Sequence, residues 1–113
     1  MKKLEIVIPD RMLNDVNNTL KEAHVGGMSY YRMEGRGKTK AASVAVGRGT
    51  QRYTPEFIPR LKVEVVVKDE QVNDLLKMLL NKLGGQSPGG KIFIVDVPLA
   101  ADLTTRQISD SVI

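Results

Sequence analysis

The order of elements along this sequence predicts an α+β domain of the split βαβ, ferredoxin-like kind, in which an antiparallel sheet carries two helices on one face. One observation and one general rule support this prediction. Strand-like and helix-like segments follow one another as β-α-β, then a long loop, then β-α-β. Crossover connections are right-handed, which places both helices on the same side of the sheet. The length of 113 residues suits a single domain over 1–113.

The first half of the chain is predicted to form a strand over 2–9, a helix over 11–23 and a strand over 28–35. Apolar residues alternate along the first strand, as expected where one face is buried. In the helix they recur every three or four residues and form one apolar stripe. Asp10 is expected to cap this helix. The apolar positions are Leu4, Ile6 and Ile8 in the strand and Met12, Leu13, Val16 and Leu20 in the helix.

The second half is predicted to form a strand over 62–68, a helix over about 70–83 and a strand over 91–97. Asp69 is expected to cap the helix. The tail over about 99–113 has no clear pattern. The apolar side of the helix contains Val72, Leu75, Leu76, Leu79 and Leu83.

The segment over about 36–59 is predicted to be a long mobile loop, because Gly and Pro interrupt a polar, basic stretch. A loop of this length in a small domain is often functional. The net charge is +4, and the cations gather between Arg32 and Lys68. This charge indicates either a solvated surface or a site for phosphate or another anion. A basic nucleic-acid-binding domain with a ferredoxin-like fold is an alternative interpretation.

Composition argues against several other classes. The absence of Cys excludes disulfides, thiolate zinc sites and Cys nucleophiles. A single His24 cannot form a multi-His metal site, so no metal centre is expected. No catalytic constellation is present, and we expect a binding protein rather than an enzyme. No apolar stretch approaches 18 residues and the first residues do not resemble a signal peptide, so a cytoplasmic location is expected.

A glycine-rich segment precedes the last strand. Gly85-Gln86-Ser87-Pro88-Gly89-Gly90-Lys91 fits the spacing G-x-x-x-x-G-K, but a helix precedes it and a strand follows, the reverse of a P-loop. Its backbone N–H groups and Lys91 would still suit a phosphate group. An ordinary helix–strand turn is the other interpretation.

The sheet face opposite the helices is expected to be exposed in a monomer. Its apolar residues include Val7 and members of the 63–67 run. Exposed apolar faces of this kind indicate oligomerisation.

Several motifs spread over about 2–98 support one interpretation together. They are Lys2-Lys3-Leu4-Glu5, Gly35-Arg36-Gly37, Arg48-Gly49 followed by Tyr53, Phe57-Ile58-Pro59-Arg60-Leu61-Lys62-Val63-Glu64-Val65-Val66-Val67, Asp69-Glu70-Gln71-Val72 and Gly90-Lys91-Ile92-Phe93. With these motifs the sequence resembles the PII nitrogen-regulatory family. The family consists of trimers that bind ATP or ADP between subunits, and its long loop docks on enzymes or on transporters, often ammonium channels. The resemblance implies recruitment to the membrane if the partner is a transporter.

Residue by residue, the resemblance implies a nucleotide site and a docking loop. The nucleotide site would comprise Val7, Ser29, Gly35, Arg36, Gly37, Lys38, Gly89, Gly90, Lys91 and Arg106. The partner or effector loop would present Lys40, Arg48, Arg52, Tyr53 and Arg60.

The sequence also departs from the family pattern. Thr39 stands where the family has a Gln that helps to bind Mg-ATP and 2-oxoglutarate, and Asp102 and Thr104 stand near the positions of two phosphate-binding arginines. The choice of nucleotide and the role of Mg therefore stay open, and a sensor of another small anion such as bicarbonate is a further alternative.

Overall fold

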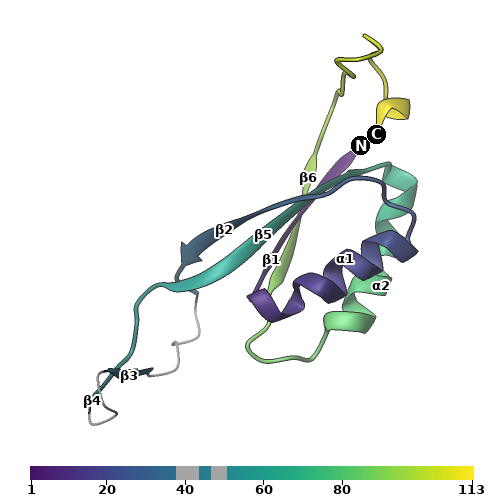
Figure 1. The fold of residues 1–113 in the computed structure, drawn as a ribbon. Coiled ribbons are helices and arrows are strands. Elements are labelled where there is room, and N and C mark those ends of the chain that lie inside the picture. The colour runs from purple at the N-terminus through teal and green to yellow at the C-terminus, as the bar shows by residue number, and fades with distance from the viewer. Residues whose placement is uncertain (38–43, 47–50) are drawn as a thin grey trace.

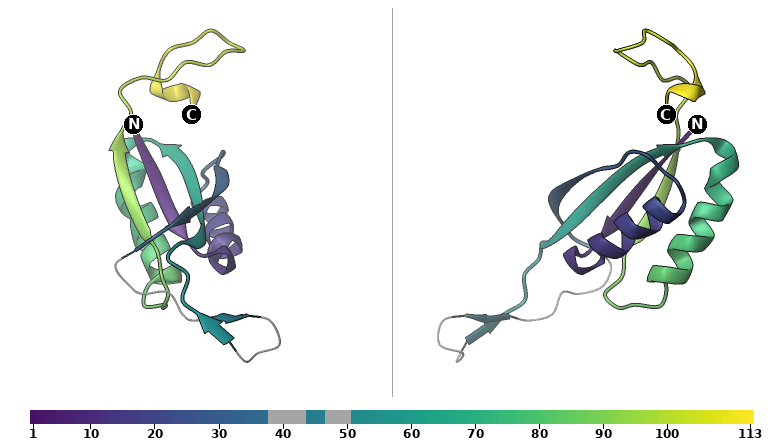
Figure 2. Two further views of the ribbon diagram at one scale, coloured as in Figure 1. Left: turned by 90° about the vertical axis from the view of Figure 1, so that its left-hand side faces the viewer. Right: turned by 45° about the vertical axis from the view of Figure 1, so that its right-hand side comes forward.

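A four-stranded antiparallel sheet with two helices on one face forms the body of the protein (Figures 1 and 2). The computed structural model describes residues 1–37, 44–46 and 51–113. The strand order β2-β5-β1-β6 confirms the predicted split βαβ, ferredoxin-like arrangement. The elements are β1 (Lys2–Ile8), η1 (Asp10–Met12), α1 (Leu13–Glu22), β2 (Ser29–Gly35), β3 (Val44–Val46), β4 (Gln51–Tyr53), β5 (Ile58–Val67), η2 (Asp69–Gln71), α2 (Val72–Leu83), β6 (Lys91–Asp96) and η3 (Asp110–Val112).

The hydrophobic core lies between the sheet and the helices. Alternate residues of β1 and β5 point towards the helices, because successive side chains of a strand face opposite sides of a sheet. These residues are almost completely buried, together with the inward stripes of the helical segments. The core comprises Leu4, Ile6, Ile8, Met12, Val16, Leu20, Leu61, Val63, Val65, Val67, Leu75 and Leu79.

Both α1 and α2 lie on one face of the sheet, and neither covers the other face (Figure 2). Glu5 lies at its centre, with Oε2 at 2.9 Å from the Lys62 Nζ atom and Oε1 at 3.3 Å from the Lys3 Nζ atom. Around this cluster the face exposes large apolar side chains, including Tyr31, which is 47% exposed, and Phe93, which is 51% exposed. We call this surface the open face. The predicted oligomerisation through it stays a prediction.

Two predicted helix caps are wrong. Both helices begin with a short 3₁₀ turn, so Asp10 and Asp69 lie inside that turn rather than before it. The Asp10 carboxylate instead accepts hydrogen bonds from Arg32 Nη1 at 2.7 and 2.8 Å. The Asp69 carboxylate lies 3.2 Å from the amino group of Met1. Both acids therefore form ion pairs with cations from other parts of the chain.

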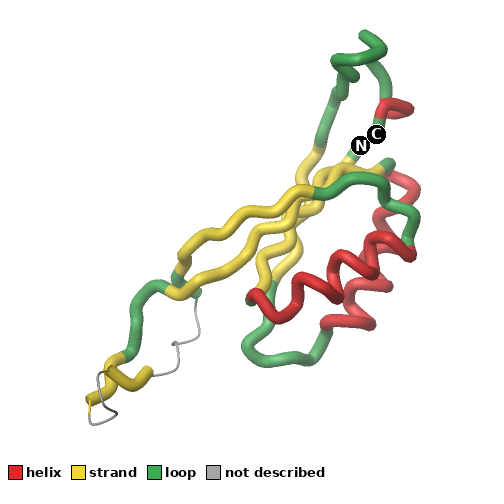
Figure 3. Tube along the Cα trace, in the orientation of Figure 1, coloured by secondary structure: helices red, strands yellow, loops and turns green. Residues whose placement is uncertain are grey.

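The segment predicted as a loop over 36–59 contains regular structure (Figure 3). Within it, β3 and β4 pair as an antiparallel hairpin that projects away from the helices. β5 begins at Ile58 rather than Lys62. It extends further because Ile58, Pro59 and Arg60 pair with β2 alone, and proline is tolerated where one side of a strand has no ladder partner. The predicted mobility falls partly on 38–43 and 47–50, which lie outside the described residues.

The C-terminal tail folds back on itself at the end of the sheet that carries Met1 (Figure 1). Ala101 and Ile108 form an isolated antiparallel bridge. Between them, the Asp102 carboxylate accepts hydrogen bonds from the backbone N–H groups of Thr104 and Thr105. The tail thus forms a turn closed by this bridge and then the short helix η3. None of the helices in the described part of the chain is both long and apolar enough to cross a bilayer.

Replacing Glu5 with Gln should make the free energy of unfolding less sensitive to acid. Hydrogen bonds from Lys62 and Lys3 hold the pKa of Glu5 below its ordinary value. A carboxyl group with a pKa depressed by folding stabilises the protein above its unfolded pKa of about 4.3, and this contribution is lost as pH falls through the folded pKa. Urea unfolding should show wild type and Glu5→Gln converging below about pH 4. A difference in stability that persists unchanged in stronger acid would contradict this.

Candidate functional site

An open cleft of about 800 Å³ lies at the end of the sheet away from the two termini. Segments from the end of β1, the exit of β2, the start of β5 and the turn before β6 meet there. The lining residues are Val7, Met33, Gly35, Arg36, Gly37, Ile58, Arg60, Ser87, Pro88, Gly89, Gly90, Lys91 and Phe93. We call this hollow the basic cleft.

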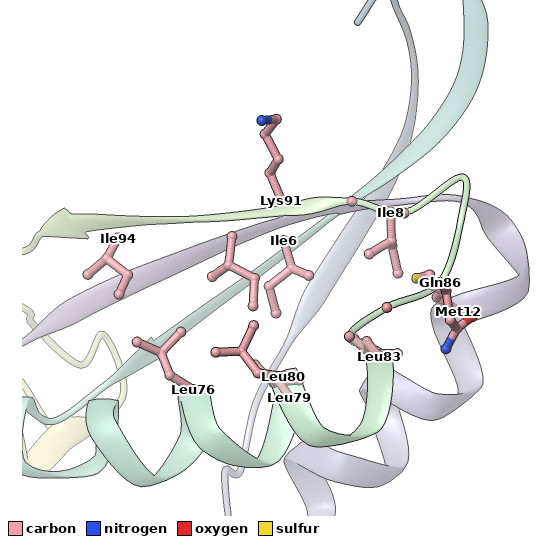
Figure 4. A pocket seen from close by; sticks show the side chains of 15 residues that line it. Ile6, Ile8, Met12, Leu76, Leu79, Leu80, Leu83, Gln86, Lys91 and Ile94 are labelled. Atoms are coloured by element: carbon pink, nitrogen blue, oxygen red, sulfur yellow. The ribbon is translucent and has the colours of Figure 1, made fainter. Parts of the chain in front are cut away.

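Strand register brings these distant segments together. Val7 pairs with Lys91 across β1 and β6, while Met33 pairs with Arg60 across β2 and β5. Paired residues of neighbouring strands share a face, so these side chains lie on the open face. Figure 4 shows the Lys91 side chain on the opposite side of β6 from the leucines of α2. The cation therefore faces the cleft rather than the core.

The turn before β6 passes so close to β1 that only glycine fits. A Cβ atom added at Gly90 would lie 2.0 Å from the carbonyl oxygen of Val7, and one added at Gly89 would lie 2.9 Å from the carbonyl oxygen of Gln86. Glycine is the residue that permits such close approach of two backbones. The missing side chain at Gly90 lets the turn lie against the end of β1, and backbone N–H groups of such a turn can bind an anion.

The charges of the cleft have one sign. Arg36, Arg60 and Lys91 line it, and no acidic residue belongs to the described lining. Glu56 lies nearby, with Oε1 at 3.1 Å from Arg36 Nη1. The Arg60 guanidinium donates a hydrogen bond to the Pro59 carbonyl at 2.9 Å and so stays beside the strand that holds it. Three cations beside a glycine-rich turn suit an anionic group such as phosphate.

Apolar side chains form the rest of the wall. Val7, Met33, Ile58 and Phe93 line the cleft beside the cations. Binding sites for small molecules commonly combine such apolar surface with a few charged groups. The arrangement therefore suits a ligand with one flat, apolar part and one anionic part.

Of the residues predicted for the nucleotide site, Val7, Gly35, Arg36, Gly37, Gly89, Gly90 and Lys91 line this one cleft. Ser29 and Arg106 do not. Ser29 lies further along the edge strand β2 and pairs with Glu64, and Arg106 belongs to the tail at the other end of the sheet. Lys38 lies outside the described residues.

The predicted docking loop is only partly described. Arg60 does not lie in that loop: it belongs to β5, and its side chain lines the basic cleft. Arg52 and Tyr53 form part of β4. Lys40 and Arg48 lie outside the described residues.

Sequence reasoning missed Met33, Ile58, Ser87, Pro88 and Phe93, which also line the cleft. Phe93 was detectable, because it follows Lys91 by two residues and must share its face. Ser87 and Pro88 lie inside the glycine-rich segment already recognised. Met33 and Ile58 required the pairing of β2 with β5, which no local pattern reveals.

A second hollow, of about 390 Å³, lies between α2 and β6 (Figure 4). Leu76, Leu79, Leu80 and Leu83 form one wall, and isoleucines of the sheet form the other. It shares Gly89, Gly90 and Lys91 with the basic cleft, so the glycine-rich turn separates the two hollows. Among the described residues, no group of three or more His, Asp or Glu side chains could hold a metal ion.

The fold and the cleft together define a ferredoxin-like α+β protein with a basic, glycine-lined cleft for an anionic ligand. The family model described as nitrogen regulatory protein P-II matches residues 1–107. The chain is 32% identical over 114 aligned residues to the nitrogen regulatory protein P-II of Pasteurella multocida (strain Pm70), with 100% of both chains covered. It is 30% identical over 112 residues to that of Porphyra purpurea, with 98% of each covered.

A similar relation holds to nitrogen regulatory protein P-II 1 of Escherichia coli (strain K12), at 31% identity over 114 residues with 100% of both chains covered. The chain therefore belongs to the P-II nitrogen regulatory family, as the motifs in its sequence suggested. The family is named for regulation, which is a signalling role rather than catalysis.

Replacing Gly90 with Ala should destabilise the protein by about 1–3 kcal/mol, because the added Cβ cannot fit against the Val7 carbonyl without moving the turn or β1. Gly27→Ala is the matched control. A Cβ at Gly27 would meet nothing within 4 Å, so that change should leave the stability within about 1 kcal/mol of wild type. Denaturant unfolding measures both. Equal stability of the two variants would contradict the close approach.

Proposed function

We propose that this P-II family protein is a homotrimeric sensor that binds an adenine nucleotide, ATP or ADP, in the basic cleft and regulates a partner protein through the 36–59 loop. The observation that carries the proposal is the lining of the cleft. Arg36, Arg60 and Lys91 lie beside a glycine-rich turn, and the described lining contains no acid. Such a site favours the phosphate groups of a nucleotide over a neutral ligand.

The charged part and the apolar part of the cleft would contact different parts of the nucleotide. The phosphates would lie against Gly89, Gly90 and Lys91, where backbone N–H groups and an ammonium group converge. The base would lie against Val7, Met33 and Phe93, which supply apolar surface and one aromatic ring. An adenine nucleotide combines a flat base and an anionic chain in this order.

Assembly would complete the site. Arg106 lies in the tail at the far end of the sheet from Lys91, so in one copy of the chain these two cations cannot reach the same ligand. The exposed tail of a neighbouring copy could bring Arg106 to the cleft. The open face, with Phe93 and Tyr31 about half exposed, supplies apolar surface for the contact between copies.

Arg36 would link the cleft to the root of the loop. Arg36 lines the cleft, and its guanidinium pairs with Glu56, a residue that precedes β5. Both side chains are exposed, so the pair alone is weak. A phosphate in the cleft would compete with Glu56 for Arg36, because charge-assisted hydrogen bonds to phosphate are strong.

That competition would weaken the ion pair between Arg36 and Glu56, which joins the two ends of the loop. Ligand binding would in this way bias how the β3–β4 hairpin meets a partner, which we propose to be a membrane transporter or a metabolic enzyme. The hairpin projects from the sheet, and this supports its role in docking (Figure 1).

Replacing Lys91 with Ala should weaken ADP binding roughly ten- to hundredfold, because a hydrogen bond to a charged group is typically worth about 1.5–3 kcal/mol. Isothermal titration calorimetry with ADP and ATP measures the change. Light scattering should show the mass of the assembly, expected to be a trimer of the 12.5 kDa chain, to be the same in the variant.

Lys77→Ala is the matched control, because Lys77 is an exposed residue of α2 outside the cleft lining. That variant should bind ADP as wild type does. If wild type binds no adenine nucleotide below millimolar concentration, the proposed ligand is wrong. Steep weakening with salt together with binding to single-stranded nucleic acid would favour the nucleic-acid alternative instead.

A further inference from the structure

The turn that forms the basic cleft is held from behind by an arginine that lies outside the cleft. Arg11 Nη2 donates a hydrogen bond to the carbonyl oxygen of Pro88, a contact between residues 77 positions apart. Arg11 belongs to η1, just before α1, and is not part of the cleft lining. Pro88 and Gly89 are part of it. Arg11 therefore contacts a turn that lines the cleft without lining the cleft itself.

This contact fixes the orientation of one peptide group. The peptide between Pro88 and Gly89 is trans. In a trans peptide the carbonyl oxygen and the amide hydrogen point in opposite directions across the plane. A Pro88 carbonyl held by Arg11 therefore turns the Gly89 N–H away from Arg11. We propose that Arg11 is a positioning residue for the phosphate site: it keeps this carbonyl out of the basic cleft and directs the Gly89 N–H into it.

The orientation matters because the two ends of a peptide have opposite charge. An N–H group attracts a phosphate, whereas a carbonyl oxygen in the same place would repel it. Gly89 has no side chain to restrict its φ angle, so without a tether this peptide can take more orientations than it could before another residue type. Gly90 is pressed against Val7 and fixes the end of the turn. Arg11 fixes the middle and so reduces the cost of ordering the turn when a ligand binds.

The surroundings leave Arg11 available for this contact. Asp10, the acid next to it in the chain, pairs with Arg32 through two hydrogen bonds of 2.7 and 2.8 Å. These bonds raise the pKa of Arg32 above its ordinary value. Arg32 is therefore a matched control: it is an exposed arginine close to Arg11 that contacts Asp10 instead of the turn.

The inference rests on the proposed function, and the experiment separates the two. Wild type, Arg11→Ala, Arg11→Lys and Arg32→Ala are titrated with ADP and with adenosine. Arg11→Ala should bind ADP roughly three- to tenfold more weakly than wild type, since one oriented donor is lost. Its affinity for adenosine, which has no phosphate, should not change. Arg11→Lys should recover part of the loss, because an ammonium group can also donate to the Pro88 carbonyl. Arg32→Ala should bind ADP as wild type does.

A second measurement needs no nucleotide. The NMR order parameter of the Gly89 backbone amide in the ligand-free protein should be lower in Arg11→Ala than in wild type and in Arg32→Ala, because the peptide has lost its tether. An unchanged order parameter, unchanged ADP affinity, or equal losses for ADP and adenosine would each overturn the positioning role. If wild type binds no nucleotide below millimolar concentration, the proposed function is wrong, and the role of Arg11 in binding phosphate is wrong as well. The titration of wild type gives this result before any variant is made.

Discussion

The antiparallel pairing of β1 with both β5 and β6 is the constraint on which the rest of the structure depends. It directs Leu4, Ile6 and Ile8 to the helices, and by the same alternation it directs Glu5 and Val7 to the open face. A slip of one residue would exchange the two sets and expose the core. The same register places Val7 opposite Lys91, so the glycine-rich turn must pass across the end of β1. Core, open face and cleft therefore follow from one pattern of pairing.

The basic cleft combines parts that differ in how firmly they are held. Gly90 lies against the Val7 carbonyl at the end of β1, which limits how the turn can move there. Arg36 and Glu56 form an exposed pair at the root of the loop, where a change of partner costs little. This contrast suits a sensor, because a fixed part can recognise the ligand while a loosely tied part responds to it. The tether from Arg11 to Pro88 belongs to the fixed part.

The fold could be predicted from local signals, because period-two and period-3.6 patterns place the strands and helices. The glycine-rich segment before Lys91 is also recognisable by itself, whereas Val7 and the segment around Arg36 are assigned to the cleft through the resemblance to the PII family. The errors arise where contacts between residues far apart in the sequence determine the role of a side chain. Asp10 pairs with Arg32 instead of capping a helix, and Arg60 reaches the cleft only because β5 continues past Pro59 along β2. The Arg11 contact spans 77 positions and has no local signature.

The central claim is that an adenine nucleotide binds with its phosphates on the glycine-rich turn. The most direct test is a titration of isotope-labelled protein with ADP, followed through its backbone amide resonances. The account predicts saturable changes below millimolar ADP that centre on Gly35 and Gly37 at the exit of β2 and on Gly89, Gly90 and Lys91 before and within β6. Absence of changes, or changes confined to residues outside the basic cleft, would contradict it.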